Sequence, residues 1–473
     1  MSRINTNVSS LIAQNILSRS NQALEQSLER LSTGLRINRG KDDPSGLIAS
    51  ENLRSDIVSV RSAITNSDRA NQIIATADSA LSEVSGLLND IRGLVTKSAN
   101  TGALSDAQIE ANQLQLDSSL EALNRISQTT SFQGRRLLDG SLDFLTTTGT
   151  NFSQITDLQI EQGSLGTTGQ VSVDVTVTTA ATQAQVDVAI PAATGGLTQD
   201  VVFQLSGADG AEVFEFETGA LITELVNAIN LQSDATGVQA TANGTTLEFT
   251  SSAFGSNSFV DIQVLSEGTG GTFNTAIGEK ARSTGLDIVA SVNGVSANGN
   301  GNELSINTAT LDLRLSAATG FTGSIGFDIT GGGALFQLGP DVVGNQQARL
   351  GFHSVNTARL GGISGKLFEL GTGKSASLTS DPSTAAKIVE EAVNQVTTLR
   401  GRLGALQKTV LDTNIRSLND TLVNLTEAES KIRDADFASE TAALTRAQIL
   451  VQSGTTVLSI ANSNPQNVLA LLR

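Results

Sequence analysis

Hydrophobic residues recur with helical spacing over a long stretch of the N-terminal third. Between Ala70 and Val95, small or apolar residues occupy positions 70, 74, 77, 81, 84, 88, 91 and 95, so the spacing alternates between four and three. This heptad pattern is typical of a helix that packs along partner helices. Asp43-Pro44 supplies a capping side chain and a proline suited to the first helical turn. The pattern predicts helices over about 44–100 and 106–128.

The C-terminal third repeats this arrangement after a second start signal, Asp381-Pro382. An apolar row occupies Ala392, Val396, Leu399, Leu403, Leu406 and Val410. The row then shifts by one residue and continues at Leu411, Ile415, Leu418, Leu422, Leu425 and Ile432. Such a skip is expected to change the supercoiling locally without ending the helix. Coiled-coil packing and ordinary bundle packing both fit the pattern, and both need partner helices. The predicted seam of this helical rod is Ile74, Leu81, Leu88, Ile91, Leu399, Leu403, Leu406 and Leu418.

The two extreme ends are also amphipathic, but they lack an obvious local partner. Gly34 and Gly40 separate the first segment from the helix that begins at Pro44. Short amphipathic helices are marginal alone and become stable when they pack on other helices. We therefore expect self-association to supply the partners. The predicted polymerisation seam is Leu24, Leu28, Leu31, Leu35, Leu444, Leu450, Leu458 and Leu469.

The middle of the chain changes to a period of two, which is typical of half-buried strands. Alternating apolar residues begin at Val171, Val186, Val260 and Leu311. Asn243-Gly244 and Asn293-Gly294 predict hairpin turns, a short helix is predicted over about 221–230, and a Gly-rich run at 268–271 is expected to divide the region into two small domains.

These patterns predict an α+β protein, with a long heptad-patterned helical bundle built from both chain ends and an inserted β-rich domain. The expected parts are terminal helices at 1–40 and 434–473, a helical rod with a β-hairpin at 41–145 and 334–433, and a β-rich, surface-exposed insertion at 146–333.

Charge is distributed unequally between these parts. The chain of 473 residues has 30 basic and 47 acidic side chains, a net charge of −17. Residues 146–333 hold 19 acidic residues and only Lys280, Arg282 and Arg314, which gives 3 − 19 = −16. The remaining residues therefore carry −17 + 16 = −1. An acidic chain without a basic cluster argues against nucleic acid as a partner.

Composition excludes several kinds of site. The chain has no Cys and a single histidine, His353, so thiolate sites and His-pair zinc sites cannot form. No apolar run reaches the roughly 18 residues that a membrane span needs, so no membrane insertion is expected. The start, Met1 to Asn7, is too polar for a cleaved secretory signal.

Candidate enzyme chemistry is also weak. Gly371 to Ser375 resembles the end of a phosphate-binding loop, but Phe368 stands where its first glycine belongs. We interpret this segment as a loop and His353 as a structural residue, and nothing singles out a pair of catalytic carboxylates. No enzymatic activity, cofactor, metal or catalytic residue is predicted.

Both ends closely resemble bacterial flagellin. The matching N-terminal motifs are Ile4–Asn7, Glu29–Asn38 (ERLSTGLRIN) and Asp42–Leu47 (DDPSGL). The C-terminal ones are Ser430–Phe437 (SKIRDADF), Gln448–Leu450 and Asn464–Leu469 (NPQNVL). The resemblance covers roughly 1–141 and 334–473, and 220–252 is similar to an insertion motif of flagellin and hook proteins.

The resemblance implies a structural subunit that polymerises with itself into the bacterial flagellar filament, the extracellular propeller for motility. It implies terminal helices in the inner core, export through the flagellum without a cleaved signal, and contacts with the export apparatus, a secretion chaperone and cap or junction proteins. The chaperone contact would use about 436–473. A hook-filament junction protein is the alternative within the same machinery, and an enzyme-bearing flagellin is the alternative from another class.

One departure concerns a surface that a vertebrate Toll-like receptor recognises in the family. Arg92 matches the family pattern, but Gly93 and Asn112 stand at positions that are usually acidic. Arg92 is thus a possible remnant of that innate-receptor surface, and the departure argues against recognition.

Overall fold

The computed structural model describes residues 6–166, 168–190, 196–277, 282–308 and 310–471, with the backbone alone from 464 onward. The chain forms two compact units. The first unit comprises residues 1–72, 337–342 and 405–473, and the second comprises 73–336 and 343–404.

The first unit is helical. Its elements are α1 (Val8–Thr33), the first part of α2 (Pro44–Ser98), α8 (Asp412–Arg433) and α9 (Phe437–Leu471). Asn7 caps α1 by accepting a hydrogen bond from the Ser10 amide. Gly34 ends α1 with φ of 73°, a left-handed conformation that glycine adopts without steric cost. Val60 and Ala63 of α2 pack against Leu418 of α8.

The helices of the second unit form a bundle from the rest of α2, α3 (Asp106–Thr129) and α7 (Pro382–Ala405). The predicted starts are confirmed, because Asp43 accepts a hydrogen bond from the Gly46 amide at α2 and Asp381 accepts one from the Thr384 amide at α7. Arg400 of α7 pairs with Asp78 of α2 at 2.9 Å. All eight heptad residues from Ala70 to Val95 are buried.

The one-residue skip in the C-terminal heptad coincides with a π-helical turn. The helix continues from α7 through the π-turn Leu406–Leu411 into α8. A π-turn accommodates one extra residue within an otherwise α-helical segment. Leu403 and Leu411 are consequently both buried although they are eight positions apart, while Val410, which the sequence pattern assigned to the apolar row, is 41 % exposed. The extra residue is therefore absorbed by a wider turn.

Deleting Thr409, an exposed residue of the π-turn, is expected to leave the fold intact. The deletion places Leu403 and Leu411 seven positions apart, so a regular α-helix can bury both. Deleting Thr421, an exposed threonine of regular α8, should instead rotate Leu422 and Leu425 out of their contacts and cost about 2 kcal/mol or more. Thermal unfolding followed by circular dichroism compares the two. Equal destabilisation would contradict this account of the π-turn.

Two sheets form the first β core. One has the order β14-β13-β5-β18-β3 and the other β15-β16-β17-β4-β20-β19, and their buried faces share one hydrophobic cluster. The strands are β3 (Phe144–Thr148), β4 (Ile155–Gly163), β5 (Val171–Thr179), β13 (Val289–Val292), β14 (Val295–Ser296), β15 (Asn298–Asn300), β16 (Glu303–Asn307), β17 (Leu311–Ala317), β18 (Gly323–Gly332), β19 (Ala334–Gln337) and β20 (Gln347–Leu350).

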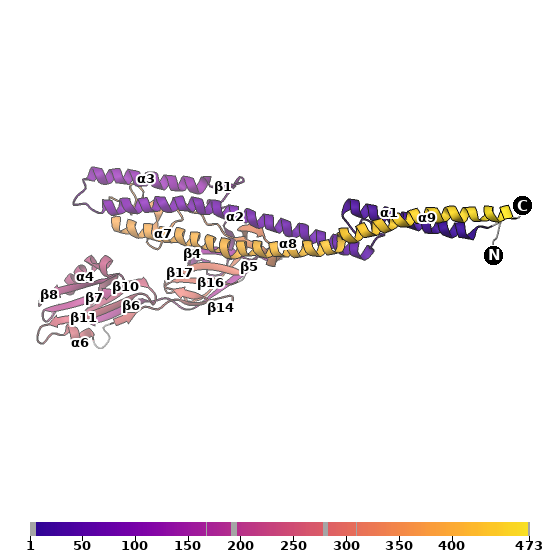
Figure 1. Cartoon of the computed structure of the whole chain (residues 1–473). Coiled ribbons are helices and arrows are strands. Elements are labelled where there is room, and N and C mark those ends of the chain that lie inside the picture. The colour runs from indigo at the N-terminus through magenta and orange to yellow at the C-terminus, as the bar shows by residue number, and fades with distance from the viewer. Residues whose placement is uncertain (1–5, 167, 191–195, 278–281, 309, 472–473) are drawn as a thin grey trace. The chain divides into compact units, whose positions relative to one another are not determined.

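The second β core is built from residues between 183 and 284, around its own hydrophobic cluster (Figure 1). Its sheets have the orders β12-β11-β7-β8 and β6-β10-β9. The elements are β6 (Gln183–Ala189), β7 (Val201–Gly207), β8 (Ala211–Phe216), α4 (Ile222–Leu231), α5 (Ser233–Thr236), β9 (Val238–Asn243), β10 (Thr246–Phe254), β11 (Phe259–Glu267), α6 (Phe273–Ile277) and β12 (Arg282–Thr284).

Short elements complete the chain. They are the hairpins β1 (Ser131–Phe132) with β2 (Arg135–Arg136) and β21 (Gly361–Gly362) with β22 (Gly365–Lys366), and the 3₁₀ turns η1 (Phe152–Gln154), η2 (Gly344–Gln346) and η3 (Leu367–Leu370). The fold is thus the predicted α+β class, with helical ends and a β-rich middle.

The middle region agrees with the sequence in its elements and differs in its division. The predicted strands, the short helix and both hairpins are confirmed, and the β13–β14 turn has Asn293 and Gly294 at φ of 50° and 79°. The expectation that 268–271 separates two domains is wrong. That run connects β11 to α6 inside the second core, which is instead inserted into the first core between Ala181 and Ile288. Strands β19 and β20 carry the β-rich region beyond residue 333, the end predicted for the insertion.

Candidate assembly surface

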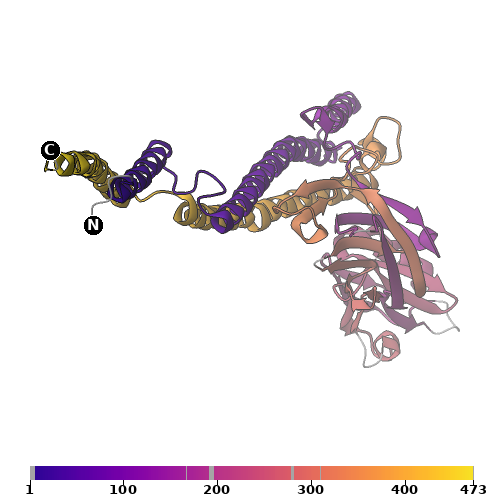
Figure 2. The same cartoon turned by 90° about the vertical axis from the view of Figure 1, so that its right-hand side faces the viewer.

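Helices α1 and α9 lie side by side in antiparallel orientation (Figures 1 and 2). The side-chain amide of Asn7 donates a hydrogen bond to the Ala461 carbonyl at 2.8 Å near one end of the pair. Arg30 lies 3.7 Å from Glu440 near the other end. The Ser10 hydroxyl adds a 2.8 Å bond to the Asn462 side chain. The two ends of the chain are therefore joined in one helix pair.

The seam between α1 and α9 is made by small residues. The buried residues are Ser10, Ala13, Ser20 and Ser27 on α1, and Ala447 and Ala461 with the buried Gly454 on α9. A Cβ added to Gly454 would come within 3.4 Å of Leu17 Cδ1, so a leucine of one helix faces a glycine of the other. Because the helices are antiparallel, seven residues after Leu17 on α1 correspond to seven residues before Gly454 on α9. Leu24 therefore lies opposite Ala447. Large side chains facing small ones let the two backbones approach closely.

The segment between α1 and α2 is fixed to the segment between α8 and α9. Arg36 donates its amide to the Arg433 carbonyl at 2.7 Å, and Leu35 forms a β-bridge with Asp434. Ile37 beside this bridge is only 1 % exposed. Asp42 accepts the Asn38 and Arg39 amides, and the Arg39 bond holds the pKa of this carboxyl below its usual value.

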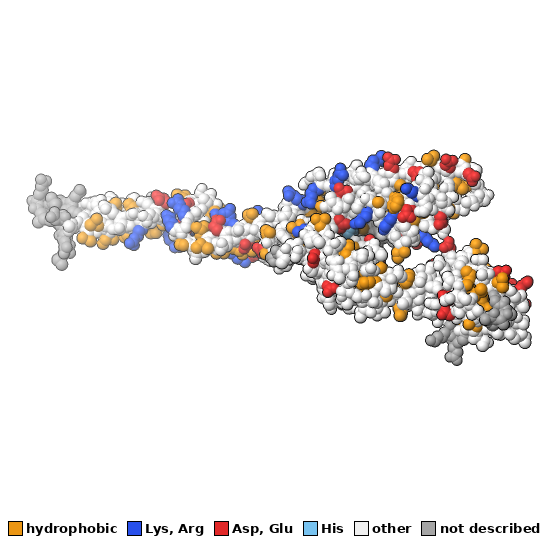
Figure 3. Space-filling model, turned by 180° about the vertical axis from the view of Figure 1, so that it is seen from behind, with side chains coloured by type: hydrophobic (Ala, Val, Ile, Leu, Met, Phe, Trp, Pro, Cys, Tyr) orange, Lys and Arg blue, Asp and Glu red, His pale blue; other side chains and the backbone are white. Residues whose placement is uncertain are grey.

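The small residues on the seam leave the large apolar side chains on the outside of the pair. Ten are between 48 % and 60 % exposed, and Figure 3 shows hydrophobic side chains (orange) along these helices. They are Val8, Leu11, Ile12, Ile16 and Leu28 on α1, and Phe437, Ile449, Leu450, Val457 and Ile460 on α9. We call these ten residues the outer apolar surface. An exposed apolar surface of this kind marks a site of association.

The structure separates the residues of the predicted polymerisation seam. Leu24, Leu31, Leu444 and Leu458 are half-buried at heptad positions of the α1–α9 contact, and Leu35 is half-buried at the bridge. Leu28 and Leu450 belong to the outer apolar surface. Leu469 falls outside the residues whose side chains are described. Sequence reasoning missed the small seam residues, although their own seven-residue spacing at Ala13, Ser20 and Ser27 was a usable signal.

The predicted rod-seam residues are distributed over both units. Ile74, Leu81, Leu88 and Ile91 of α2, Leu399 and Leu403 of α7 and Leu418 of α8 are buried, and Leu406 is half-buried in the π-turn. Arg92 is exposed on α2. Together with Gly93 and Asn112 it lines a shallow groove of about 880 Å³. Asn112 donates a hydrogen bond to Ser98 at 3.1 Å.

His353 is half-buried, with 15 % of its side chain exposed, within a network of charges in the second unit. Its Nδ1 lies 3.1 Å from Asp143 and its Nε2 lies 3.6 Å from Glu161, which also pairs with Arg402 of α7 at 2.7 Å. Burial by itself would lower the pKa of His353, but the two carboxylates outweigh it and raise the pKa to about 9. Burial pushes the pKa of Glu161 upward, yet His353 and Arg402 bring it below the usual value. The residue is thus a structural cation at neutral pH.

Neither a metal centre nor a membrane span is found in the part of the chain that the structure describes. No group of three or more His, Cys, Asp or Glu side chains there could hold a metal ion. None of the described helices combines the length and apolar character that crossing a bilayer requires.

The two ends of the chain pair as helices through small residues, and a β-rich region is inserted between them. This arrangement is typical of a structural protein. The model of the bacterial flagellin N-terminal helical region matches residues 4–143, and the model of the C-terminal helical region matches 386–472. A B-type flagellin of Pseudomonas aeruginosa is 32 % identical over 521 residues, covering 99 % of each chain. Flagellins of Salmonella rubislaw (29 %, 99 % of each chain) and Helicobacter pylori (flagellin B, 28 %, 100 % of this chain and 99 % of that one) are also similar.

The chain belongs to the bacterial flagellin family. This is a family of structural proteins, and the chain is accordingly a subunit of the extracellular flagellar filament.

Proposed function

We propose that this chain polymerises into the flagellar filament through the outer apolar surface of its α1–α9 pair. The observation that carries the proposal is that the fully buried residues of the pair are small, while ten large apolar side chains remain exposed on its outside. Two helices alone cannot cover these ten side chains. Helix pairs from neighbouring copies can, and each copy added then buries apolar surface that favours association by about 25 cal/mol per Å².

The proposal extends to the division of labour within the chain. Terminal helices at 1–40 and 434–473 form the filament core, the rod at 41–145 and 334–433 surrounds it, and the insertion at 146–333 lies on the surface. Family membership supports export through the flagellum without a cleaved signal, a chaperone on the C-terminal helix and contact with cap and junction proteins. It also supports the absence of enzymatic activity. No observation on this chain favours the hook-filament junction alternative.

Charge in the second β core should oppose assembly. Residues 184–277 contain 11 acidic residues and no Lys or Arg, namely Asp187, Asp200, Asp209, Glu212, Glu215, Glu217, Glu224, Asp234, Glu248, Asp261 and Glu267. Neighbouring copies held side by side in a filament repel one another through these charges, and salt screens the repulsion over a Debye length of about 10 Å at 0.1 M.

Critical concentration measured against sodium chloride tests both statements. The full chain should form filaments, seen by sedimentation and electron microscopy, with a critical concentration that falls as salt rises. Replacing residues 184–284, which include the 11 acidic residues above and the whole of β12, by a short Gly-Ser linker should preserve assembly and weaken the salt dependence. The linker can be short because Thr182 and Leu286, on either side of the excision, form a β-bridge. A chain that stays monomeric would overturn the proposed function, and equal salt slopes would remove the role of charge.

A further inference from the structure

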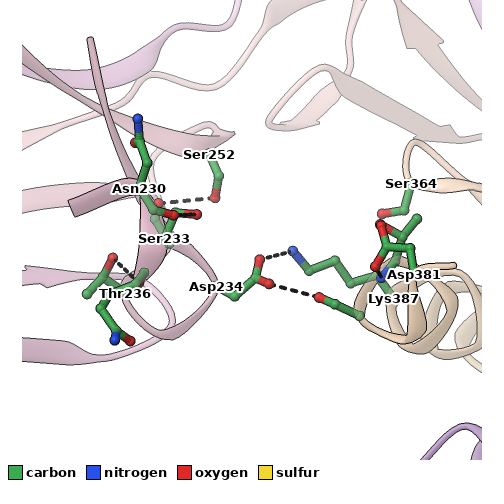
Figure 4. A network of polar contacts seen from close by, with 12 residues as sticks. Asn230, Ser233, Asp234, Thr236, Ser252, Ser364, Asp381 and Lys387 are labelled. Atoms are coloured by element: carbon green, nitrogen blue, oxygen red, sulfur yellow. Dashed lines mark hydrogen bonds and ion pairs between the residues drawn. The ribbon is translucent and has the colours of Figure 1, made fainter. Parts of the chain in front are cut away.

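A one-turn helix of the second β core contacts the start of α7, which belongs to the helical bundle of the same unit. Asp234 of α5 accepts a hydrogen bond from the Lys387 ammonium at 2.8 Å and one from the Ser383 hydroxyl at 2.8 Å (Figure 4). The two partners lie 153 and 149 positions away in the sequence. Each oxygen of the carboxylate thus has its own donor on α7.

Each side of this contact is held in place by hydrogen bonds within its own part of the chain. On the core side, the Ser233 hydroxyl donates to the Asn230 carbonyl, and the Gly237 carbonyl accepts the Ser252 amide and hydroxyl, which braces the α5 turn (Figure 4). On the other side, Asp381 caps α7 by accepting both the amide and the hydroxyl of Thr384. Little freedom is therefore lost when the contact closes, which favours its formation.

The ion pair joins a strongly acidic β core to an isolated lysine of α7. Between residues 184 and 277 the second β core has 11 acidic residues and no basic one, and Arg282 of its strand β12 pairs with Asp261 within the core. Lys387 is the only Lys or Arg between Lys374 and Arg400. The pair is exposed, with 56 % of the Lys387 and 64 % of the Asp234 side chain accessible to solvent. Exposed ion pairs are weak and are screened by salt.

We propose that Asp234, Ser383 and Lys387 form a salt-sensitive latch that holds the second β core against α7. Opening the latch lets the core bend at its junction with the first core, where its Phe254 packs against the first cluster and Asn257 contacts Asn300. The weakness of the contact is what allows it to open and close. At low ionic strength the ion pair closes the latch. High salt opens it. The proposal does not depend on how the chain polymerises.

Spin-label distance measurement between Gln239→Cys and Glu390→Cys tests the latch. Both positions are exposed, one on β9 of the second core and one on α7, and the natural chain has no other cysteine to label. At low ionic strength we expect a single narrow distance distribution. In about 1 M sodium chloride, where the Debye length is about 3 Å, the narrow peak should be lost. Lys387→Glu and Asp234→Lys should each cause the same loss without salt.

The charge-swapped double variant, Asp234→Lys with Lys387→Glu, separates a latch from a general disturbance of the fold. It should restore the narrow peak at low ionic strength, because the ion pair is re-formed with its signs exchanged. Lys431→Gln, which removes the similarly exposed Lys431–Glu427 pair on α8, should leave the distribution unchanged. A distribution that is broad from the start, or that ignores salt and the single variants, would overturn the proposal. Failure of the swap to restore the peak would overturn it as well.

Discussion

Replacing Ile12 by Asp is expected to abolish filament assembly while leaving the α1–α9 pair folded. Ile12 is 56 % exposed in the single chain, so a carboxylate there meets water and costs the folded chain little. In a filament the same side chain would be buried between copies, where an unpaired charge costs several kcal/mol. A cost of about 3 kcal/mol per contact raises the critical concentration by about two orders of magnitude. Sedimentation of the polymer measures this, and circular dichroism checks the helices.

Two further variants show whether the position of the charge decides the outcome. Leu28→Asp, at the outer apolar surface near the C-terminal end of α1, should also prevent assembly. Gln22→Asp adds the same charge at an exposed position seven residues after the exposed Asn15, and it should assemble nearly normally. Normal filaments from Ile12→Asp would contradict the proposed surface. Equal loss in all three variants would show only that added negative charge hinders assembly.

Raising the pH from about 6.5 to above 9 should destabilise the region around His353 by about 3 kcal/mol. The folded pKa of about 9 lies above the ordinary value of 6.5, so the folded state holds the proton more tightly than the unfolded state. The stabilisation is fully present below the unfolded pKa and is lost as the pH rises through the folded one. A difference of about 2.5 units at 1.36 kcal/mol per unit gives the stated size. Because this histidine is the only one in the chain, a single imidazole NMR resonance reports its titration directly.

His353→Gln is the matched variant for the pH prediction. At pH 6 it should be less stable than the natural chain, because Asp143 and Glu161 lose the cation between them. Above pH 9.5 the two proteins should differ far less, since the natural His353 is then neutral. The free energy of unfolding from urea titrations at the two pH values gives the comparison. An imidazole that titrates near 6.5 would contradict the charged network.

Much of the helical architecture was readable from local pattern. The heptad from Ala70 to Val95 and the Asp-Pro signals at Asp43 and Asp381 predicted α2 and α7 within a few residues, because periodicity and caps act over one or two turns. The alternation from Val171 and the Asn293-Gly294 turn predicted strands and a hairpin for the same reason. Family motifs at both ends added the identity of the chain, which physical pattern alone did not supply.

The sequence was sufficient to assign the helices and strands, their apolar residues, and the division of charge along the chain. Which leucines of α1 face α9 became clear only in the folded chain. A spacing of three or four residues fits either of two adjacent rows on α1. The small residues of α9 face one of these rows, so Leu24 lies at the α1–α9 seam while Leu28 points outward. The tertiary structure also decided that the second β core is inserted at Ala181 and Ile288, and that His353 is charged. Those outcomes depend on contacts between side chains far apart in the sequence, such as those of Asp143, Glu161 and Arg402. Local sequence patterns do not predict such contacts.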